Sequence, residues 1–272
     1  MYLGIDIGGT KTIVAVLDEH GVITESQRFM TPQDYQTFLS KLSETVDTFT
    51  THEFIAIGAG VPATSIDRVA GIAIAFSNLS WQDEPIQSDL ERLFKAPAAI
   101  ENDAKLAGLS EAMLRDPMRL LYLTISTGIG YSLVVDRKID ANIGDGGGRL
   151  LRFEHEGKLT PWEYFASGRA IVETYGKQAK DIEDPDIWDK IARNITVGLI
   201  ELIAMCEPDI VVVGGSVGAY LDRFIKPLKA HLKSLETPLL KIPPVEEAKR
   251  PEDAVIYGCY DYVKGILSAG QF

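Results

Sequence analysis

The sequence predicts a mixed α/β fold built from two related lobes with a cleft between them. Three observations carry this prediction. Short apolar strands alternate with helical patterns along the chain, and two hairpins of the same strand–glycine–strand type recur. The composition is globular, with 46% hydrophobic and 24% charged residues, and 272 residues correspond to about two domains.

The first hairpin joins residues 2–7 to residues 13–17 through a glycine turn. The second covers residues 122–136 and repeats it, because Tyr122, Leu123 and Gly128 match Tyr2, Leu3 and Gly8 in order and spacing. Strand–glycine–strand units also recur by chance in α/β proteins. The match in both order and position favours an internal duplication.

The remaining elements follow from apolar spacing. Between the hairpins we expect a helix over 36–49, a buried strand over 54–60, a strand over 98–100 and a helix over 104–115. After the second hairpin we expect helices over 161–175, 187–205, 219–235 and 255–267, with a buried strand over 209–215.

The turn of the first hairpin has the residues of an anion site. Its glycines, Gly8 and Gly9, allow backbone N–H groups to approach an anion closely, while Thr10 adds a hydroxyl and Lys11 a positive charge. It is not a Walker A loop, because GxxxxGK[ST] is absent and the turn leads into a strand. Taken alone, such a turn is more often only a turn.

A second turn carries hydroxyls and glycines at Ser126, Thr127, Gly128 and Gly130. Two such turns facing one another would clamp a polyphosphate, and Asp6 would then be suited to hold Mg²⁺ through water. The loop at Gly214 and Gly215 follows a buried strand but fails the GxGxxG dinucleotide pattern. We interpret this loop as a place for a nucleoside to pack.

Asp103 follows Asn102 at the end of a predicted strand, where ligand groups collect in open α/β sheets. A carboxylate there can accept the proton of an attacking hydroxyl. The alternative is a simple helix cap, which stabilises by about 1 kcal/mol.

Net charge and cysteine content argue against several other classes of protein. A net charge of −12 repels a nucleic-acid backbone, so we expect no nucleic-acid partner. Two cysteines, Cys206 and Cys259, outside any CxxC motif make a disulfide scaffold or a structural zinc site improbable. No apolar run is as long as a membrane span, and the chain starts directly in a predicted strand, so we expect a cytoplasmic protein without a membrane partner.

Together these residues resemble the ROK family of sugar kinases, within the actin-like, hexokinase-like ATPase superfamily. The resemblance covers nearly the whole chain in order: DIGGTK at 6–11, GAGVPA at 58–63, FSNLSW at 76–81, ENDAKLAGLSE at 101–111, LTISTGIG at 123–130 and IVVVGGSVG at 210–218. It implies an actin-like (ribonuclease H-like) duplicated fold. The implied small lobe is 1–114 with 257–272, and the large lobe is 115–256.

The resemblance also implies roles for individual residues. Asp103 would be the general base, and Asn78, Asn102 and Glu163 would contact a hexose together with Asp103. ATP would be held by the two glycine turns and the loop at Gly214 and Gly215, with Mg²⁺ held through water at Asp6. The implied phosphate contacts are Gly8, Gly9, Thr10, Lys11, Thr127, Gly128 and Gly130. Members of the family are commonly homodimers, so we expect a homodimer.

Two departures from the family pattern concern the sugar site. Gly147 and Leu150 stand where the family has a sugar-binding Glu and a His, and the cysteines of the family's zinc motif are absent. We therefore expect no structural zinc. Asp145, Arg149, Glu154 or His155 are alternative replacements for the lost pair.

The leading hypothesis is an ATP-dependent, glucokinase-like hexose kinase of carbohydrate metabolism that phosphorylates glucose at C6. One alternative changes the donor to inorganic polyphosphate, against which the acidic net charge argues. Another is a catalytically weak, sugar-sensing pseudokinase, motivated by Gly147 and Leu150. The family's repressors place a winged helix before the kinase-like core, whereas this sequence opens on the first strand, so we expect no DNA-binding role.

Overall fold

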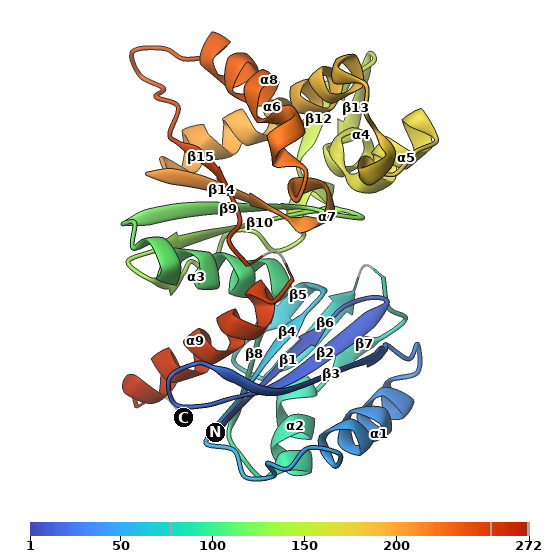
Figure 1. The fold of residues 1–272 in the computed structure, drawn as a ribbon, viewed down its shortest axis with the longest axis vertical. Helices are drawn as coiled ribbons and strands as arrows, with labels where there is room; N and C mark the ends of the chain where they lie inside the picture. Colours follow the sequence, from blue (N-terminus) through green and yellow to red (C-terminus); the bar gives the residue numbers. More distant parts are fainter. Residues whose placement is uncertain (77, 251, 271–272) are drawn as a thin grey trace. The chain divides into compact units, whose positions relative to one another are not determined.

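The computed structural model describes residues 1–76, 78–250 and 252–270 (Figure 1). Ser77 of the sugar-side segment and the last two residues of the predicted small lobe lie outside the described residues. The chain forms two compact units, residues 1–110 with 252–272 (unit 1) and residues 111–251 (unit 2). The division falls within helix α3 (Asp103–Arg115).

The described part of unit 1 contains a five-stranded sheet. In spatial order its strands are β3 (Ile23–Met30), β2 (Lys11–Leu17), β1 (Tyr2–Ile7), β4 (Ala56–Val61) and β8 (Ala98–Asn102). Strands β1, β4 and β8 are parallel, and β2 and β3 continue the sheet antiparallel. In this register Asp6, Gly60 and Glu101 lie side by side near the carboxyl ends of three parallel strands.

Helices cover both faces of the unit 1 sheet. Helix α9 (Ala254–Ser268) packs on one face through Ile256, Tyr260 and Val263. Helices α1 (Tyr35–Val46) and α2 (Ile86–Phe94) bury their apolar sides on the other face. A smaller sheet, β5 (Ala63–Asp67), β6 (Ile72–Phe76) and β7 (Gln82–Glu84), follows the end of β4.

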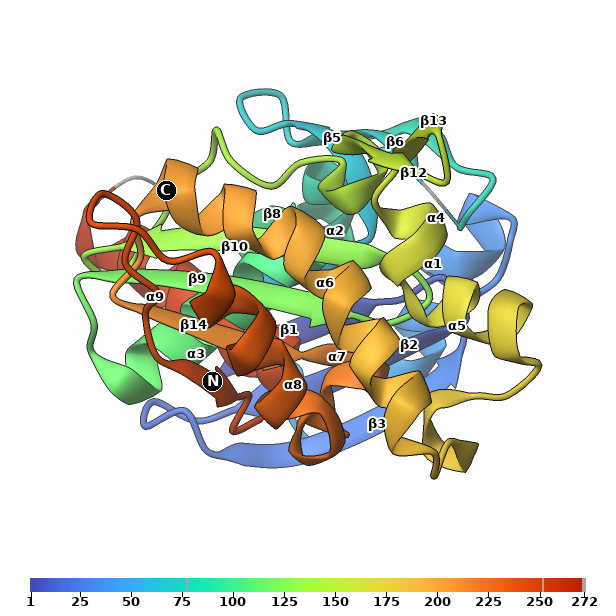
Figure 2. The ribbon, with the colours of Figure 1, turned by 90° about the horizontal axis from the view of Figure 1, so that it is seen from above.

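The main sheet of unit 2 has the same order and directions as that of unit 1. In spatial order its strands are β11 (Lys138–Ile139), β10 (Ile129–Val135), β9 (Arg119–Ile125), β14 (Ile210–Gly214) and β15 (Val245–Glu247). Helices α6 (Pro185–Cys206) and α8 (Leu221–Ser234) run across this sheet and bury its core (Figure 2). The matching sheet orders agree with the predicted duplication.

The structure corrects one predicted helix of unit 2 and adds a hairpin. The helix expected over 161–175 is two helices, α4 (Glu163–Ala166) and α5 (Gly168–Tyr175). They are separated by the extended residue Ser167, whose Oγ accepts the Ala170 N–H at 3.3 Å and so caps α5. The segment before them forms a hairpin, β12 (Arg152–His155) and β13 (Lys158–Pro161), that was not expected.

Three short helical turns complete the description of unit 2. They are η1 (Gly147–Arg149), η2 (Ala179–Asp181) and α7 (Gly215–Gly218). Over the residues that the structure describes, no helix combines the length and the apolar character that crossing a bilayer demands.

Candidate active site

The first glycine turn is a tight connection between β1 and β2. The Gly8 N–H donates to the Lys11 carbonyl at 2.9 Å, and a Cβ on Gly8 would lie 2.7 Å from the same oxygen. A Cβ on Gly9 would lie 2.7 Å from the Cβ of Asn78. The turn therefore requires both glycines, and it brings the predicted sugar residue Asn78 against the predicted phosphate turn.

A group of carboxylates lies at the carboxyl ends of the unit 1 strands. Burial raises the pKa of Asp6 to about 7, and the nearby charges of Asp103 and Asp253 add to this rise while Lys11 opposes it. Burial likewise raises the pKa of Asp103 to about 6, against the lowering effect of the Ala104 N–H, which donates to Asp103 Oδ1 at 2.7 Å. Both carboxylates are thus poised to exchange protons near neutral pH.

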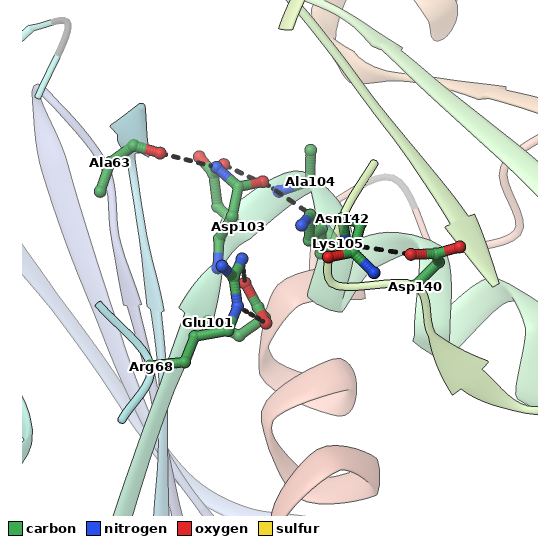
Figure 3. Close-up of polar contacts among 9 residues, drawn as sticks. Ala63, Arg68, Glu101, Asp103, Ala104, Lys105, Asp140 and Asn142 are labelled. Carbon is green, nitrogen blue, oxygen red and sulfur yellow. Dashed lines mark hydrogen bonds and ion pairs between the residues drawn. The ribbon is translucent and has the colours of Figure 1, made fainter. Parts of the chain in front are cut away.

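Two side chains, those of Asn102 and Glu101, anchor the segment that carries Asp103, and Figure 3 shows Glu101 paired with Arg68. The Asn102 side-chain amide donates to the Ala63 carbonyl at 3.0 Å, and its oxygen accepts the Lys105 N–H at 3.3 Å. Glu101 is 1% exposed and forms a bidentate ion pair with Arg68. Arg68 Nε lies 2.8 Å from Glu101 Oε2, and Arg68 Nη2 lies 2.6 Å from Glu101 Oε1. The second amide hydrogen of Asn102 has no partner among the described residues, so it is available to a ligand.

A buried pair of hydroxyls supports the first glycine turn from β2 and from the end of β3. Thr31 Oγ1 donates to the Gly8 carbonyl at 2.8 Å and lies 2.9 Å from Thr12 Oγ1. The Thr31 N–H also donates to the Thr10 carbonyl at 2.9 Å. Nothing in the local sequence pattern singles out Thr31, because its partners are distant along the chain.

Replacing Thr31 by valine is expected to lower the free energy of unfolding by about 1–3 kcal/mol, because the buried Thr12 hydroxyl and the half-buried Gly8 carbonyl lose their partner. Urea unfolding measures this loss. The matched control is Thr24→Val on β3, the strand that ends just before Thr31. There the hydroxyl of an exposed residue donates to the Val16 carbonyl, and the expected change is within about 0.5 kcal/mol. Equal losses in the two variants would contradict a special role for Thr31.

The second glycine turn, residues 126–128, is held by backbone contacts in unit 2. The Ser126 N–H donates to the Gly128 carbonyl at 2.9 Å, and the Ser126 carbonyl accepts the Gly168 N–H at 2.7 Å. The Ser216 N–H donates to Ser126 Oγ at 3.0 Å. At Gly215, where φ is +86°, a Cβ would lie 2.5 Å from the Ile125 carbonyl, so only glycine fits this close approach.

A cavity of about 460 Å³ opens beside the second turn, within unit 2. Its polar lining consists of Ser126, Thr127, Arg169, Gln178, Lys180, Ser216 and Tyr220. The guanidinium carbon of Arg223 lies 4.6 Å from the centre of the Tyr220 ring, and Arg223 Nη1 donates to the Lys180 and Ile182 carbonyls. The cavity therefore combines positive charge, hydroxyls and an aromatic ring held in place by Arg223.

The predicted site residues fall into two groups, one in each unit. Unit 1 gathers the first turn, Asp6, Asn78, Asn102 and Asp103, and unit 2 gathers Thr127, Gly128, Gly130, Glu163, Gly214 and Gly215. Gly214 is closely packed, since a Cβ there would lie 2.3 Å from the Tyr122 hydroxyl. The cavity residues Arg169, Lys180 and Tyr220 were not identified from the sequence.

Residues 147–150, which depart from the family pattern, lie close to the start of β10 and to Glu163. Gly147 has φ +54°, and a Cβ there would lie 2.2 Å from the Ile129 carbonyl, so this backbone has no room for a glutamate. Leu150, which stands where the family has a histidine, is 67% exposed. Between them, Arg149 Nη2 lies 3.4 Å from Glu163 Oε1.

Comparison with known proteins identifies a matching family. A model of the ROK family matches residues 2–266. A glucokinase of Streptomyces coelicolor is 25% identical over 85% of this chain and 86% of its own length. A xylose repressor of Caldicellulosiruptor bescii is 24% identical over 75% of this chain and 61% of its own length.

Solved structures support the fold. A ROK family glucokinase from Streptomyces griseus, in complex with glucose and AMPPNP, matches with a TM-score of 0.80 at 21% identity, over 96% of this chain and 98% of that one. The predicted two-lobe, actin-like α/β fold is thereby confirmed.

Proposed function

The chain belongs to the ROK family, and on that premise we propose that it is a sugar kinase that transfers the γ-phosphoryl group of ATP to a hexose hydroxyl. Glucose, phosphorylated at C6, is the first substrate to test. The observation that carries the proposal is the Asp103 carboxylate, which lies at the start of α3 in the same unit as the first glycine turn and has a pKa raised to about 6. The sugar kinases among the relatives support the same reaction class.

Asp103 acts as the general base in this mechanism. The sugar oxygen forms a bond to the γ-phosphorus while the bond from that phosphorus to the β–γ bridging oxygen breaks, and ADP leaves. Asp103 takes the hydroxyl proton late in this transfer. A pKa of about 6 leaves the carboxylate ionised at neutral pH and more basic than an ordinary aspartate, and such a base contributes about 10²–10⁴-fold in rate.

The two glycine turns and the unit 2 cavity are proposed to hold the nucleotide. The turns present backbone N–H groups to the phosphates, with Thr10, Lys11 and Thr127 adding hydroxyls and charge. The cavity accepts the nucleoside, where Tyr220 offers a ring and Arg169 and Lys180 supply positive charge that the acidic chain lacks overall. Excluding water around the phosphates limits hydrolysis of the donor.

The carboxylate group of unit 1 fits Mg²⁺. Asp6 has a raised pKa partly because Asp103 and Asp253 are near, so a cation there would relieve an excess of negative charge. Mg²⁺ keeps several of its waters when it binds and coordinates phosphate oxygens, so it needs few protein ligands. Asp6 would hold this Mg²⁺ through water, and the ion would neutralise phosphate charge.

The sugar is proposed to lie beside Asn78 and Asn102, which would orient its hydroxyls toward Asp103. Asn78 lies against Gly9, and Asn102 retains one amide hydrogen for a hydroxyl. Glu163 belongs to this group by resemblance only, and both of its oxygens already have partners in unit 2.

A coupled assay of ADP release over a panel of hexoses and N-acetylated amino sugars tests this function. The expected result is Mg²⁺-dependent turnover of at least one sugar with ATP. Turnover with inorganic polyphosphate alone would replace the donor but keep the reaction. Saturable sugar binding with no turnover on either donor would contradict a kinase and identify a sugar sensor.

A further inference from the structure

Arg68 lies outside every motif of the candidate site, yet its side chain reaches the strand that leads to Asp103. It is the first residue after β5, in the turn that leads to β6. Its Nε and Nη2 donate to the two oxygens of Glu101, at 2.8 and 2.6 Å (Figure 3). Glu101 precedes Asn102, the last residue of β8. The ion pair therefore joins the β5–β6 hairpin to the carboxyl end of β8.

The Glu101 carboxylate also holds the backbone next to Asp103. Glu101 Oε1 accepts the N–H of Asn102 at 2.7 Å, so one oxygen binds both the guanidinium and the last N–H of β8. An arginine that binds both oxygens of a carboxylate fixes its plane as well as its position. Arg68 thus sets the direction from which Glu101 meets the Asn102 N–H, one residue before Asp103.

This ion pair is shielded from water on the face of the sheet that α9 covers. Side chains alternate between the two faces of a strand, and Ala99, two residues before Glu101, packs against α9. The Arg68 side chain is 24% exposed and that of Glu101 1%. Burial raises the pKa of Tyr262 on α9 to about 12, and the charge of Glu101 adds to this rise while Arg68 opposes it. Because little water reaches Glu101, its charge needs the compensation that Arg68 provides.

The opposite face of the same strand end is attached to the hairpin as well. The Asn102 side-chain amide donates to the carbonyl of Ala63, the first residue of β5, at 3.0 Å. The hairpin is thus joined to β8 at two points, at its start through Asn102 and at its turn through Arg68. One hydrogen bond would let the strand end rotate, whereas two attachments on opposite faces fix the direction in which Asp103 leaves the strand.

We propose that Arg68 is a positioning residue for the Asp103 carboxylate and acts through Glu101. This inference rests on the proposed function, because it takes Asp103 to be the group that accepts the sugar proton. A base must lie within hydrogen-bond reach of that proton, and a displacement of about 1 Å costs about 100-fold in rate. In this role Arg68 touches no substrate and keeps Asn102 and Asp103 in the geometry that the transfer requires.

The first test is Arg68→Met, measured by steady-state kinetics and by calorimetric binding of AMPPNP. We expect kcat to fall about 10–100-fold and Kd for AMPPNP to stay within about twofold, because the change displaces the proton acceptor and leaves the glycine turns in place. Arg68→Lys keeps the charge but loses the fork that spans both oxygens, so kcat should fall only about three- to tenfold. Wild-type kcat in either variant, once it is shown to be folded, would overturn the proposal.

The second test removes the buried charge and so separates positioning from folding. Arg68→Met alone leaves Glu101 uncompensated, whereas Arg68→Met/Glu101→Gln replaces the ion pair by two neutral groups, so the double variant should unfold within a few degrees of wild type. Because Arg68 acts through Glu101, Arg68→Met should lower kcat by less than about twofold when it is added to Glu101→Gln. The double variant should still have a kcat about tenfold or more below wild type. Additive losses, or a stable double variant with wild-type kcat, would overturn the proposal.

The matched control is Arg92, which also pairs with a buried carboxylate of unit 1. Arg92 Nη2 lies 2.6 Å from Asp89 Oδ1 on α2, and Asp89 is 6% exposed. No residue of α2 is proposed to contact sugar or nucleotide. Arg92→Met should therefore lower the unfolding temperature without changing kcat, KM for the sugar or AMPPNP binding. A loss of kcat as large as that of Arg68→Met would overturn the positioning role, because breaking either ion pair would then have the same effect.

The outcomes separate this inference from the proposed function. A wild-type chain that turns over no sugar with any donor overturns the proposed function, and the inference with it. A wild-type chain that phosphorylates a sugar while the folded Arg68 variants do so equally well overturns the inference alone.

Discussion

Replacing Asp103 by asparagine is expected to lower kcat by about 10²–10⁴-fold, or roughly 3–5 kcal/mol of barrier, in a protein that stays folded. Asparagine keeps the shape of the side chain and an oxygen for the Ala104 N–H, which donates to Asp103 Oδ1 in the wild type. It cannot accept the proton of the sugar hydroxyl. Steady-state kinetics with the best sugar of the panel measure the effect.

The pH dependence follows from the raised pKa of Asp103. The base must be ionised, so kcat should fall as the pH drops through about 6 and should be level above about 7.

Thermal stability should change with pH in the opposite direction to kcat. The pKa of the folded state exceeds that of the unfolded state, so protonation stabilises the fold at low pH, and that stabilisation is lost as pH rises through about 6. Asp103→Asn should therefore unfold at a higher temperature than wild type at pH 8 and at a similar temperature near pH 4.

A matched control for Asp103 is Asp34, another aspartate at the start of a helix. Asp34 caps α1, with Oδ1 accepting the Thr37 N–H at 2.8 Å, and hydrogen bonds from Thr37 lower its pKa. Asp34→Asn should leave kcat and its pH profile unchanged. A similar loss of kcat in both variants, or a flat pH profile for the wild type between 5 and 7, would contradict the base assignment.

Replacing Gly258 by alanine is expected to lower the free energy of unfolding by about 3 kcal/mol or more. Helix α9 crosses α3 at this glycine, and an added Cβ would lie 2.0 Å from the carbonyl oxygen of Leu106. Because that oxygen belongs to a helix backbone, one of the two helices must move. Leu106 lies one turn after Asp103, so kcat should fall together with stability. Urea unfolding and kinetics measure the two effects.

Gly265 provides the control within the same helix. A Cβ on Gly265 would have no neighbour within 4 Å, so Gly265→Ala replaces a poor helix former without a clash. We expect a gain in stability of about 0.5–1 kcal/mol and no change in kcat. Destabilisation by both variants to the same extent would show that the crossing of α9 and α3 is looser than the structure indicates.

Local patterns predicted the elements that carry the site but not what fixes them in place. The strand–glycine–strand pattern gave both hairpins, and ENDAKLAG placed Asp103 at the start of a helix. The contact of Thr31 with Gly8 and that of Glu163 with Ile129 were not foreseen, because each joins residues more than twenty positions apart. The break at Ser167 was missed because a continuous helical pattern concealed a cap.

The sequence by itself determined the family, the mixed α/β class, the two glycine turns and the acidic residues beside them, because these depend on residue type and on spacing over a few positions. Only the tertiary structure decided which groups share an environment. It placed Asp6 near Asp103, and burial raised the pKa values of both carboxyls. It also gave each oxygen of Glu163 a partner and left no room for a side chain at Gly147. The physical reason is that burial, charge coupling and close packing arise between segments distant along the chain, and these set the chemistry of a carboxylate.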